Sequence, residues 1–496
     1  MDLVMVTSSP RRLCRVSPFL VFALFLGCGD DPDPAPAPSP PAISWEECGG
    51  GFECATFSVP VNHDAPDGRT FSIPLVRRPA AVPSARIGSL LVNPGGPGGS
   101  GVGWARGLQI FLPQPLKDRF DLVGFDPRGQ AGSTPRIDCV DDLGPLIGLD
   151  PTPDDAAEQQ ALVAGADAFA AACEARSGEL LPFVGTNHIV RDMDLLREAL
   201  GDEKLTFLGF SYGTFVGAMY AETYPERVRA LVLDAAIDPT VPGDRYIEGQ
   251  AVAFEAELEK FLADCAADAK CAFHSGGDPQ SAYDAVKAAI EASPLPAPPG
   301  GERALGPGEF VYGVARPLYD ESQWKGLAEA LALAAAGDGS GLLAYADDYV
   351  ARSEDGSYDD SFEVYYGVIS VDLPFPADPA VYQALTGELQ SKAPRFGASL
   401  PATALPSARW PVPPWRSNTP VSAAGAPPIL VVGGTGDPAT PYAWSVSLAE
   451  QLSSGVLLTR EGPGHISFLR DHTCIDQAVT DYLVDRKVPA KGTTCK

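Results

Sequence analysis

Hydrophobic positions in the first half of the chain alternate between two spacings. Short apolar runs, typical of buried strands, are separated by stretches whose apolar residues recur every three or four positions, as in the helices predicted at 156–175 and 187–200. Strands separated by helices predict an α/β fold with a mostly parallel sheet and helices on both faces. The strands predicted in this half are residues 55–61, 70–76, 87–92, 121–125, 205–208 and 228–233.

The pattern changes between residues 241 and 424, where strands and helices no longer alternate. Helices separated by Pro- and Gly-rich connections are predicted there, and strand-like runs resume at 427–434 and 455–459. We therefore predict that residues 45–240 and 425–496 form one sheet domain, and that residues 241–424 form a mainly helical cap inserted into it. The helices predicted in the cap are residues 251–267, 279–292, 321–336 and 380–391.

Residues 209–213 read Gly-Phe-Ser-Tyr-Gly and join a predicted strand to a predicted helix. This G-x-S-x-G pattern between strand and helix is typical of a nucleophile elbow, a tight turn that exposes its serine. Glycines flank the turn because a Cβ would clash there, and the N-terminal end of the helix favours developing negative charge. We therefore predict that Ser211 is a nucleophile. For this motif alone, a Gly-rich loop without chemistry is the alternative.

A Gly-rich segment follows the predicted strand at 87–92. It reads Asn-Pro-Gly-Gly-Pro-Gly-Gly-Ser-Gly over residues 93–101, so its backbone can approach a ligand closely. A phosphate cradle is one use of such a loop, but neither a Walker Lys-Ser/Thr ending nor a dinucleotide fingerprint is present. We predict instead that an N–H of this loop and the N–H of Tyr212 form an oxyanion hole beside Ser211.

A serine nucleophile needs a base, and the chain has five histidines. His465 lies in a Gly-rich loop directly after the last predicted strand, where its side chain can reach the C-terminal edge of the sheet. Asp437 lies in a loop after the preceding strand, and the order Ser211, Asp437, His465 is the one that this elbow fold requires. We therefore predict a triad of these three residues. The histidines expected to be structural or at the surface are His63, His188 and His274.

The N-terminus has the composition of an export signal. Arginines precede an apolar run at 19–26 that is too short to span a membrane as an ordinary helix. The run ends in Phe-Leu-Gly-Cys, which is similar to a bacterial lipobox in which Cys28 would carry the lipid. A plain secretory signal and twin-arginine export are the alternatives. We expect residues 1–28 to be the signal and the Pro-rich residues 29–44 to be an extended tether.

Cysteine usage supports the same destination. The chain has 10 cysteines, and setting aside Cys14 and Cys28 in the signal leaves an even number, as in exported disulfide-bonded proteins. Sequence does not determine the connectivity, and a metal site is the alternative, although no C-x-x-C pair and no clustered histidines accompany these residues. The pairs favoured by local spacing are Cys48–Cys54, Cys139–Cys173, Cys265–Cys271 and Cys474–Cys495.

The chain is strongly acidic. Its 496 residues include 36 Lys and Arg against 64 Asp and Glu, which gives a net charge of −28. This charge argues against nucleic acid and anionic membrane surfaces as partners, because both repel acidic proteins. A solvated acidic surface accounts for most of this net negative charge. We expect contact with a membrane only through a lipid anchor at Cys28.

Several motifs resemble those of exported bacterial tripeptidyl aminopeptidase-type α/β-hydrolases, which are related to proline iminopeptidases. The resemblance covers nearly the whole mature chain. It implies an α/β-hydrolase fold and a serine exopeptidase that removes short peptides or single residues from free N-termini. It also implies that Gly96 and Tyr212 supply the oxyanion N–H groups. The motifs are residues 93–98, 126–129, 209–214, 436–441 and 464–465.

An exopeptidase has to bind the α-ammonium of its substrate, and a carboxylate of the cap is a natural partner. Relatives of this type often have a Cys-x-Asp pattern where this chain has Ser370-Val371-Asp372. The resemblance therefore implies that Asp372 binds the ammonium, although Ser370 stands in place of the cysteine. A structural role for Asp372 is the alternative.

Together these observations predict an exported serine hydrolase, secreted or anchored in the cell envelope, that needs neither metal nor cofactor. Its substrate would be a peptide or a small acyl compound. An esterase or other ester/amide hydrolase is the alternative enzyme, because the same triad serves many acyl substrates. An inactive hydrolase fold that only binds is the alternative outside enzymes. The retained serine, acid, histidine and Gly-rich loop argue against that last hypothesis.

Overall fold

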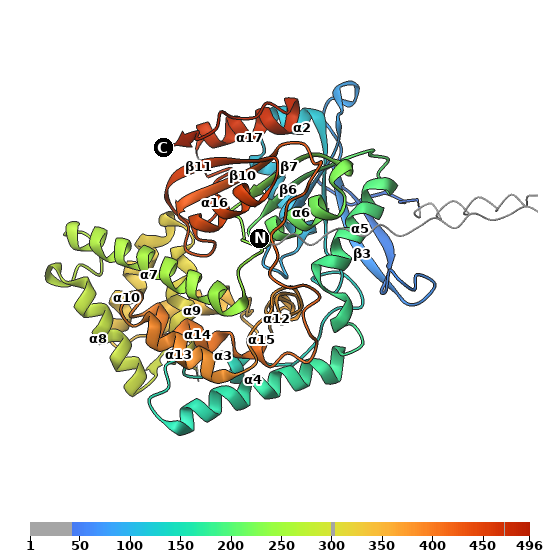
Figure 1. The fold of residues 1–496 in the computed structure, drawn as a ribbon. Coiled ribbons are helices and arrows are strands. Elements are labelled where there is room, and N and C mark those ends of the chain that lie inside the picture. The colour runs from blue at the N-terminus through green and yellow to red at the C-terminus, as the bar shows by residue number, and fades with distance from the viewer. Residues whose placement is uncertain (1–41, 299–302, 471) are drawn as a thin grey trace, which may run out of the picture. The chain divides into compact units, whose positions relative to one another are not determined.

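A computed structural model describes residues 42–298, 303–470 and 472–496 (Figure 1). The predicted export signal, Cys28 and most of the predicted tether fall in residues 1–41 and so lie outside the described residues. No helix in the described ranges combines the length and the hydropathy needed to cross a membrane.

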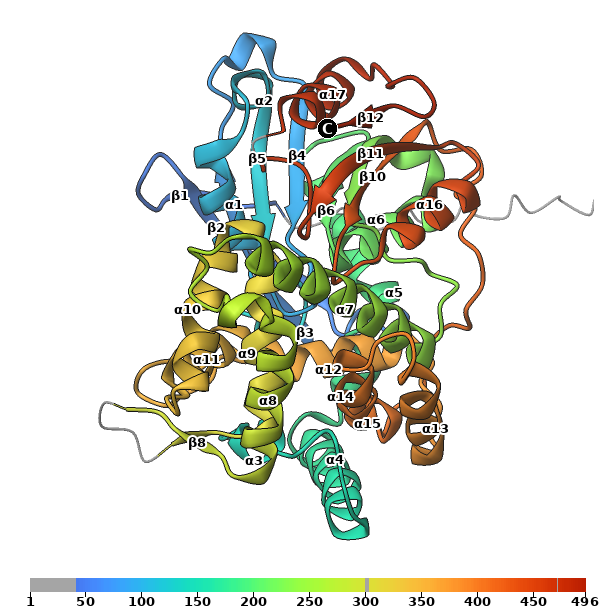
Figure 2. The same ribbon diagram turned by 90° about the vertical axis from the view of Figure 1, so that its left-hand side faces the viewer.

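A ten-stranded sheet forms the centre of the described chain (Figures 1 and 2). Its order is β1-β2-β3-β5-β4-β6-β7-β10-β11-β12. All pairs from β5 to β12 are parallel, whereas the pairs that involve β1, β2 and β3 are antiparallel. The prediction of a mostly parallel sheet is confirmed. The strands are β1 (Glu46–Glu47), β2 (Glu53–Pro60), β3 (Thr70–Arg78), β4 (Gly88–Asn93), β5 (Phe120–Phe125), β6 (Leu205–Phe210), β7 (Val228–Asp234), β10 (Ile429–Gly436), β11 (Gly455–Pro463) and β12 (Thr494–Cys495).

Both faces of the sheet are apolar and covered by helices. Successive strand residues point to opposite faces, so Leu90 and Val92 of β4 belong to one hydrophobic cluster and Leu91 to another. This explains why the central strands read as continuous apolar runs rather than as an alternating pattern. The covering helices are α1 (Gly101–Phe111), α2 (Gln114–Arg119) and α17 (Thr473–Asp485) on the first face, and α5 (Thr186–Ala199), α6 (Tyr212–Thr223) and α16 (Tyr442–Gln451) on the second.

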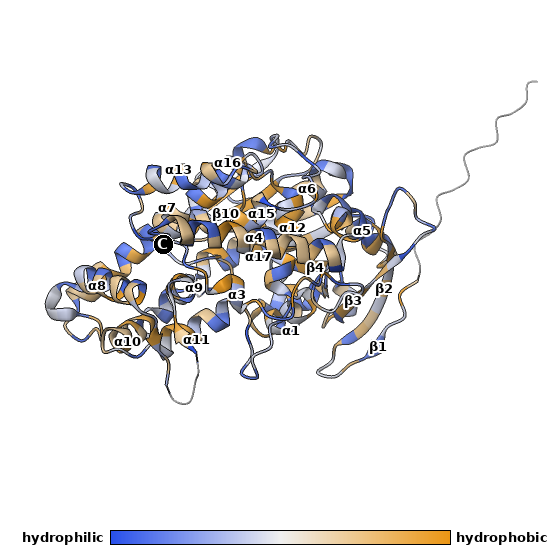
Figure 3. Ribbon diagram, turned by 90° about the horizontal axis from the view of Figure 1, so that it is seen from below, coloured by the Kyte–Doolittle hydropathy of each residue, from blue (hydrophilic) through white to orange (hydrophobic). Residues whose placement is uncertain are grey.

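Between β7 and β10 the chain forms a helical layer, made of α7 to α15, below the C-terminal ends of the strands (Figure 2). Hydrophilic and hydrophobic residues occur on the same helices of this layer, such as α8 and α10 (Figure 3), as expected where one helix face is buried. The helices are α7 (Gly243–Ala267), α8 (Pro279–Ala292), α9 (Pro307–Leu318), α10 (Trp324–Ala335), α11 (Ser340–Tyr349), α12 (Ser361–Asp372), α13 (Pro379–Leu389), α14 (Phe396–Thr403) and α15 (Leu405–Ala408). A two-stranded sheet of β8 (Leu295–Pro296) and β9 (Ala304–Leu305) joins α8 to α9.

Helix α4 (Ala156–Ser177) departs from the domain division expected from sequence. It belongs to the segment assigned to the sheet domain, yet it packs against α15 of the helical layer (Figure 1). The ring of Phe169 in α4 lies 5.5 Å from that of Tyr366 and 6.4 Å from that of Trp410, measured between centroids. These partners are far from α4 in sequence, so no local pattern signals the contact.

Four disulfide bonds join described residues, and they are the pairs that local spacing favours: Cys48–Cys54, Cys139–Cys173, Cys265–Cys271 and Cys474–Cys495. The last bond ties the start of α17 to the edge strand β12. Such bonds persist in oxidising compartments and are typical of exported proteins. Within the described ranges, no group of His, Cys, Asp and Glu residues is arranged to hold a metal ion.

Candidate active site

Ser211 occupies the turn between β6 and α6. Its backbone has φ 52° and ψ −123°, a strained conformation that a non-glycine residue adopts only where the surroundings impose it. Gly209 permits the turn, because a Cβ there would lie 2.4 Å from the carbonyl oxygen of Gly213. The N–H of Ser211 donates to the carbonyl of Asp234 at the end of the neighbouring strand β7, 2.9 Å away. The elbow is therefore held at the C-terminal edge of the sheet.

The Gly-rich loop after β4 lies directly beside this elbow. A Cβ on Gly95 would lie 2.5 Å from the carbonyl oxygen of Phe210 and 2.8 Å from the nitrogen of Tyr212, so only glycine allows this approach. Among the described residues, the N–H groups of Gly96 and Tyr212 donate to no protein acceptor. Gly96 and Ser211 also line the same cavity, of about 370 Å³. Two free donors thus lie near the hydroxyl, as an oxyanion hole requires.

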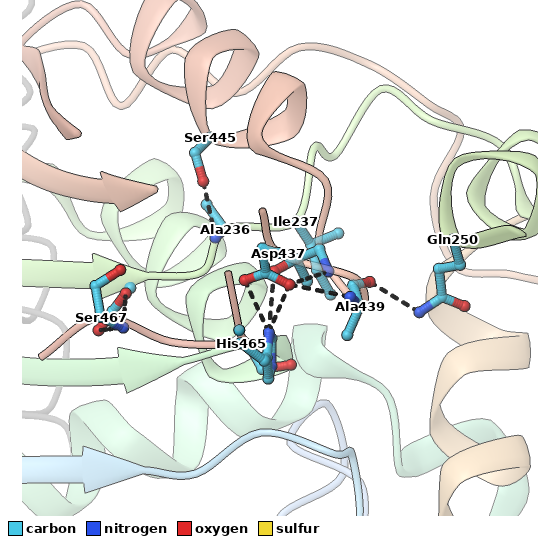
Figure 4. Close-up of polar contacts among 12 residues, drawn as sticks. Ala236, Ile237, Gln250, Asp437, Ala439, Ser445, His465 and Ser467 are labelled. Atoms are coloured by element: carbon cyan, nitrogen blue, oxygen red, sulfur yellow. Dashed lines mark hydrogen bonds and ion pairs between the residues drawn. The ribbon is translucent and has the colours of Figure 1, made fainter. Parts of the chain in front are cut away.

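Asp437 and His465 are hydrogen-bonded to each other on the loops that follow β10 and β11 (Figure 4). The Nδ1 of His465 lies 2.8 Å from Oδ1 and 2.9 Å from Oδ2 of Asp437. Asp437 is 3 % exposed, and it also accepts hydrogen bonds from the N–H groups of Ala439 and Thr440 and from the Thr440 hydroxyl. Because a carboxylate only accepts, Nδ1 carries the hydrogen and Nε2 is left as an acceptor.

The three predicted residues share one edge of the sheet. Strands β6, β7, β10 and β11 are neighbours and parallel, so the loops that carry Ser211, Asp437 and His465 all leave the same edge. Between the described groups of Ser211 and His465 there is no hydrogen bond. Such bonds are often long in enzymes without substrate and shorten when it binds.

Ser211 and His465 line two different cavities. The first, which we call the serine cavity, is the one of about 370 Å³ that Gly96 also lines. The second, which we call the histidine cavity, has a volume of about 1070 Å³ and is lined by His465 but not by Ser211. Tyr319 lines both cavities, and its ring centroid is 5.4 Å from that of His465. The cavities therefore adjoin at Tyr319, whose ring packs against the imidazole of His465.

Buried polar groups hold the His465 loop, and sequence analysis missed them. Asp234 is fully buried at the end of β7 and accepts hydrogen bonds from the N–H groups of Ser467 at 3.0 Å and Phe468 at 2.7 Å. Burial raises the pKa of Asp234 to about 6. The guanidinium of Arg460 donates to the carbonyl of Gly464 at 2.7 Å. The position of Asp234 directly after the predicted strand at 228–233 is the only signal that sequence offers for it.

Aromatic side chains dominate the serine cavity. Burial raises the pKa of its six tyrosines, so their hydroxyls stay neutral at physiological pH. Its charged lining residues are Arg316 and Asp348, which form an ion pair at 2.5 Å. The aromatic lining residues are Tyr246, Phe254, Tyr312, Tyr319, Tyr349, Phe362, Tyr365 and Tyr366.

Asp372 lies in the core rather than in either cavity, at 0 % exposure. Its carboxylate accepts hydrogen bonds from the N–H of Thr186 at 2.9 Å, from the Thr186 hydroxyl at 2.6 Å, from the Tyr212 hydroxyl and from the indole N–H of Trp415. Donors thus occupy both oxygens, which argues against the ammonium site expected there. Asp372 instead braces Tyr212, the residue next to Ser211 in the elbow.

The three histidines expected to be structural or at the surface lie outside the site. His63 contacts Asp192 at 2.8 Å, and the same carboxylate binds the fully buried Arg128. Burial and the nearby Arg128 lower the pKa of His188 to about 4. His274 precedes a short 3₁₀ turn in the helical layer. Neither cavity is lined by any of these histidines.

Glu257 of α7 is a buried carboxyl beside the loop of Asp437. It is 5 % exposed, and its Oε2 has no hydrogen-bond partner among the described residues. Its Oε1 lies 2.5 Å from the position that a Cβ on Gly436 would take. Burial raises the pKa of Glu257 to about 7, and the negative charge of Asp437 adds to the shift.

We expect Glu257→Gln to raise Tm at pH 8 but not at pH 4. The Glu257 carboxyl titrates near pH 7 in the folded chain and near pH 4.5 in the unfolded chain. The folded state therefore holds this proton more tightly, and the resulting stabilisation is complete below pH 4.5 and lost as the pH rises through 7. The glutamine side chain is uncharged, so it avoids the buried negative charge that Glu257 carries above pH 7. Calorimetry should show a rise of about 1–3 °C at pH 8, because roughly 1–3 kcal/mol is at stake and a chain of this length shifts by only about 1 °C per kcal/mol. The exposed Glu259→Gln is the control, and an equal shift at both pH values contradicts the prediction.

Comparison with known proteins agrees with this architecture. A family described as alpha/beta hydrolase fold matches residues 88–275, and one described as TAP-like protein matches residues 393–495. Serine protease Hip1 of Mycobacterium tuberculosis is 37% identical over 464 residues, which cover 90% of this chain and 88% of that protein. Carboxylesterase B of Mycobacterium tuberculosis is 35% identical, with 89% and 86% covered. Tripeptidyl aminopeptidase of Streptomyces lividans is 32% identical, with 91% and 86% covered. The chain therefore belongs to the tripeptidyl aminopeptidase-like family of α/β-hydrolases and is a serine hydrolase.

Proposed function

We propose that this protein is a serine exopeptidase that releases short peptides or single residues from the free N-termini of peptides. The observation that carries the proposal is the hydrogen bond between His465 and Asp437, on the two loops that leave the same sheet edge as the Ser211 elbow. A buried carboxylate that orients an imidazole beside a strained serine is the arrangement that activates a hydroxyl for acyl transfer.

In the proposed reaction, Ser211 Oγ attacks the carbonyl carbon of the scissile amide while Nε2 of His465 takes the hydroxyl proton. The negative charge that develops on the carbonyl oxygen is bound by the N–H groups of Gly96 and Tyr212. The imidazolium, stabilised by Asp437, then protonates the leaving amine as the C–N bond breaks, which leaves an acyl-enzyme. Water, deprotonated by the same imidazole, releases the acyl product and returns the proton to Ser211.

An exopeptidase also needs a partner for the free α-ammonium. Asp348 is the carboxylate among the described residues that line the serine cavity, so we propose Asp348 for this role in place of Asp372. Its ion pair with Arg316 would have to rearrange when the ammonium binds. The aromatic rings of the cavity can add cation–π attraction.

The exopeptidase proposal predicts that a free amine is required. A tripeptide chromogenic amide should be cleaved at least tenfold more efficiently, by kcat/KM, than the same amide with an acetylated N-terminus, because acetylation removes the charge that Asp348 binds. The variant Asp348→Asn should lose most of this preference while keeping turnover of the acetylated amide. Equal cleavage of the free and acetylated amides would exclude an exopeptidase.

An esterase is the second candidate function, and the similarity to carboxylesterase B is the observation that favours it. If the protein is an esterase, its kcat/KM for p-nitrophenyl esters should far exceed its kcat/KM for every tripeptide amide tested. The Asp348 carboxylate and the size of the serine cavity favour the peptidase.

We further propose that the chain is exported and that Cys28 carries a lipid anchor. The four disulfides support export. The anchor rests on the sequence of residues 1–28 alone. Mass spectrometry of the mature N-terminus distinguishes a lipidated Cys28 from a secreted chain.

A further inference from the structure

In the proposed reaction the acyl group of the substrate does not occupy the histidine cavity. It is about 1070 Å³, against about 370 Å³ for the serine cavity. His465 lines it, whereas Ser211 and Gly96 line the smaller cavity. The nucleophile and the predicted oxyanion donor therefore face one space, and the proton donor for the leaving group faces the other.

This division assigns the two sides of the scissile bond. The acyl carbonyl must lie against Ser211 Oγ with its oxygen toward Gly96, which places the acyl part of a substrate in the serine cavity. The leaving amine must lie within hydrogen-bond reach of His465, because the imidazole protonates it. The part of a substrate that follows the scissile bond is thus directed into the histidine cavity.

We propose that the histidine cavity is a binding site for the polypeptide that follows the scissile bond, so that the preferred substrates are peptides extending several residues beyond it. The proposal rests on the exopeptidase function and specifies its substrate class. The smaller serine cavity limits the fragment released, whereas the larger cavity takes the remaining chain. Ligand sites in proteins commonly measure about 300–1,000 Å³, so the histidine cavity has room for several residues.

The walls of the histidine cavity indicate the side chains that it accepts. The C-terminal half of α1 contributes Leu108 and Phe111, and Phe468 follows the His465 loop. Phe111 is 70 % exposed and lines the same cavity as His465, and an exposed aromatic ring in a cavity wall is a typical place for a ligand to bury apolar surface. The cavity also has charged lining residues, among them Asp320, which pairs with Arg470 at 2.7 Å. We expect an apolar residue shortly after the scissile bond to pack on Phe111.

Two substrates with the same N-terminal tripeptide test the proposal. One is a tripeptide p-nitroanilide, whose leaving group is a single ring, and the other is a free decapeptide with leucine at the second position after the scissile bond. Phe111→Ser should raise KM for the decapeptide about fivefold and change KM for the anilide less than twofold, because only the decapeptide reaches the ring. Phe111→Leu should restore most of the loss.

Ile110 provides a matched control. It is 66 % exposed on the same helix turn but does not line the cavity, so Ile110→Ser should leave both KM values unchanged. Circular dichroism melts verify that each variant is folded. Equal effects of Phe111→Ser on the two substrates, or none on either, overturn the proposal while the exopeptidase function stands. Failure of the parent enzyme to cleave either free substrate overturns both.

Discussion

Ser211→Ala is expected to lower kcat for a tripeptide amide by roughly a million-fold, with little change in KM. The methyl group cannot attack the carbonyl, so the covalent route is lost, while the oxyanion donors and the binding cavities remain. The residual rate should still exceed that of water by about a thousand-fold or more. Steady-state kinetics, together with loss of labelling by a fluorophosphonate, measures the effect.

Ser361 offers the matched control for this experiment. It lines the same cavity as Ser211, yet its hydroxyl donates to the carboxylate of Asp359 rather than to an imidazole. Ser361→Ala should change kcat less than about twofold and keep the fluorophosphonate label. A Ser211→Ala protein that hydrolyses amides as fast as its parent, or that still takes up the label, would show that another residue is the nucleophile.

Asp437→Asn should lower kcat by about ten-thousand-fold at neutral pH. The amide nitrogen of asparagine would donate to Nδ1 of His465, which moves the imidazole hydrogen to Nε2 and removes the acceptor that Ser211 needs. The remaining Oδ1 can still accept from the N–H groups of Ala439 and Thr440, now 3.0 and 2.8 Å away, so the loop should keep its shape. Kinetics at pH 7 and a thermal melt separate loss of chemistry from loss of folding.

Asp338 is a suitable control for the aspartate, because it accepts a comparable turn hydrogen bond from the N–H of Ser340 at 2.9 Å but lines neither cavity. Asp338→Asn should leave kcat within about twofold of the parent. If Asp437→Asn retains more than a tenth of the parent kcat while remaining folded, the orienting role of Asp437 is wrong.

The sequence alone determined those features that depend on neighbours in the chain. The Ser211 elbow could be read because a strained turn needs glycines within two residues of the serine, as at Gly209. Asp437 and His465 could be proposed as partners from sequence because each lies within two residues of the end of a strand, and parallel strands bring their C-terminal ends to one edge. The disulfide pairs could be read from spacing because their partners are at most 34 residues apart.

Only the tertiary structure decided what surrounds each side chain. Asp372 looked available to a substrate, but Thr186, Tyr212 and Trp415, each distant in sequence, enclose it and satisfy its carboxylate. Helix α12 is buried on nearly all sides, so its residues lack the polar face that reveals a surface helix.

The support of the His465 loop by Asp234 and the division of the site into two cavities are likewise products of packing. Burial, and with it pKa and accessibility, depends on residues brought together across the fold, which local periodicity does not encode. For this reason the sequence could nominate candidate residues for the triad, whereas the two cavities that Ser211 and His465 line follow from the folded chain.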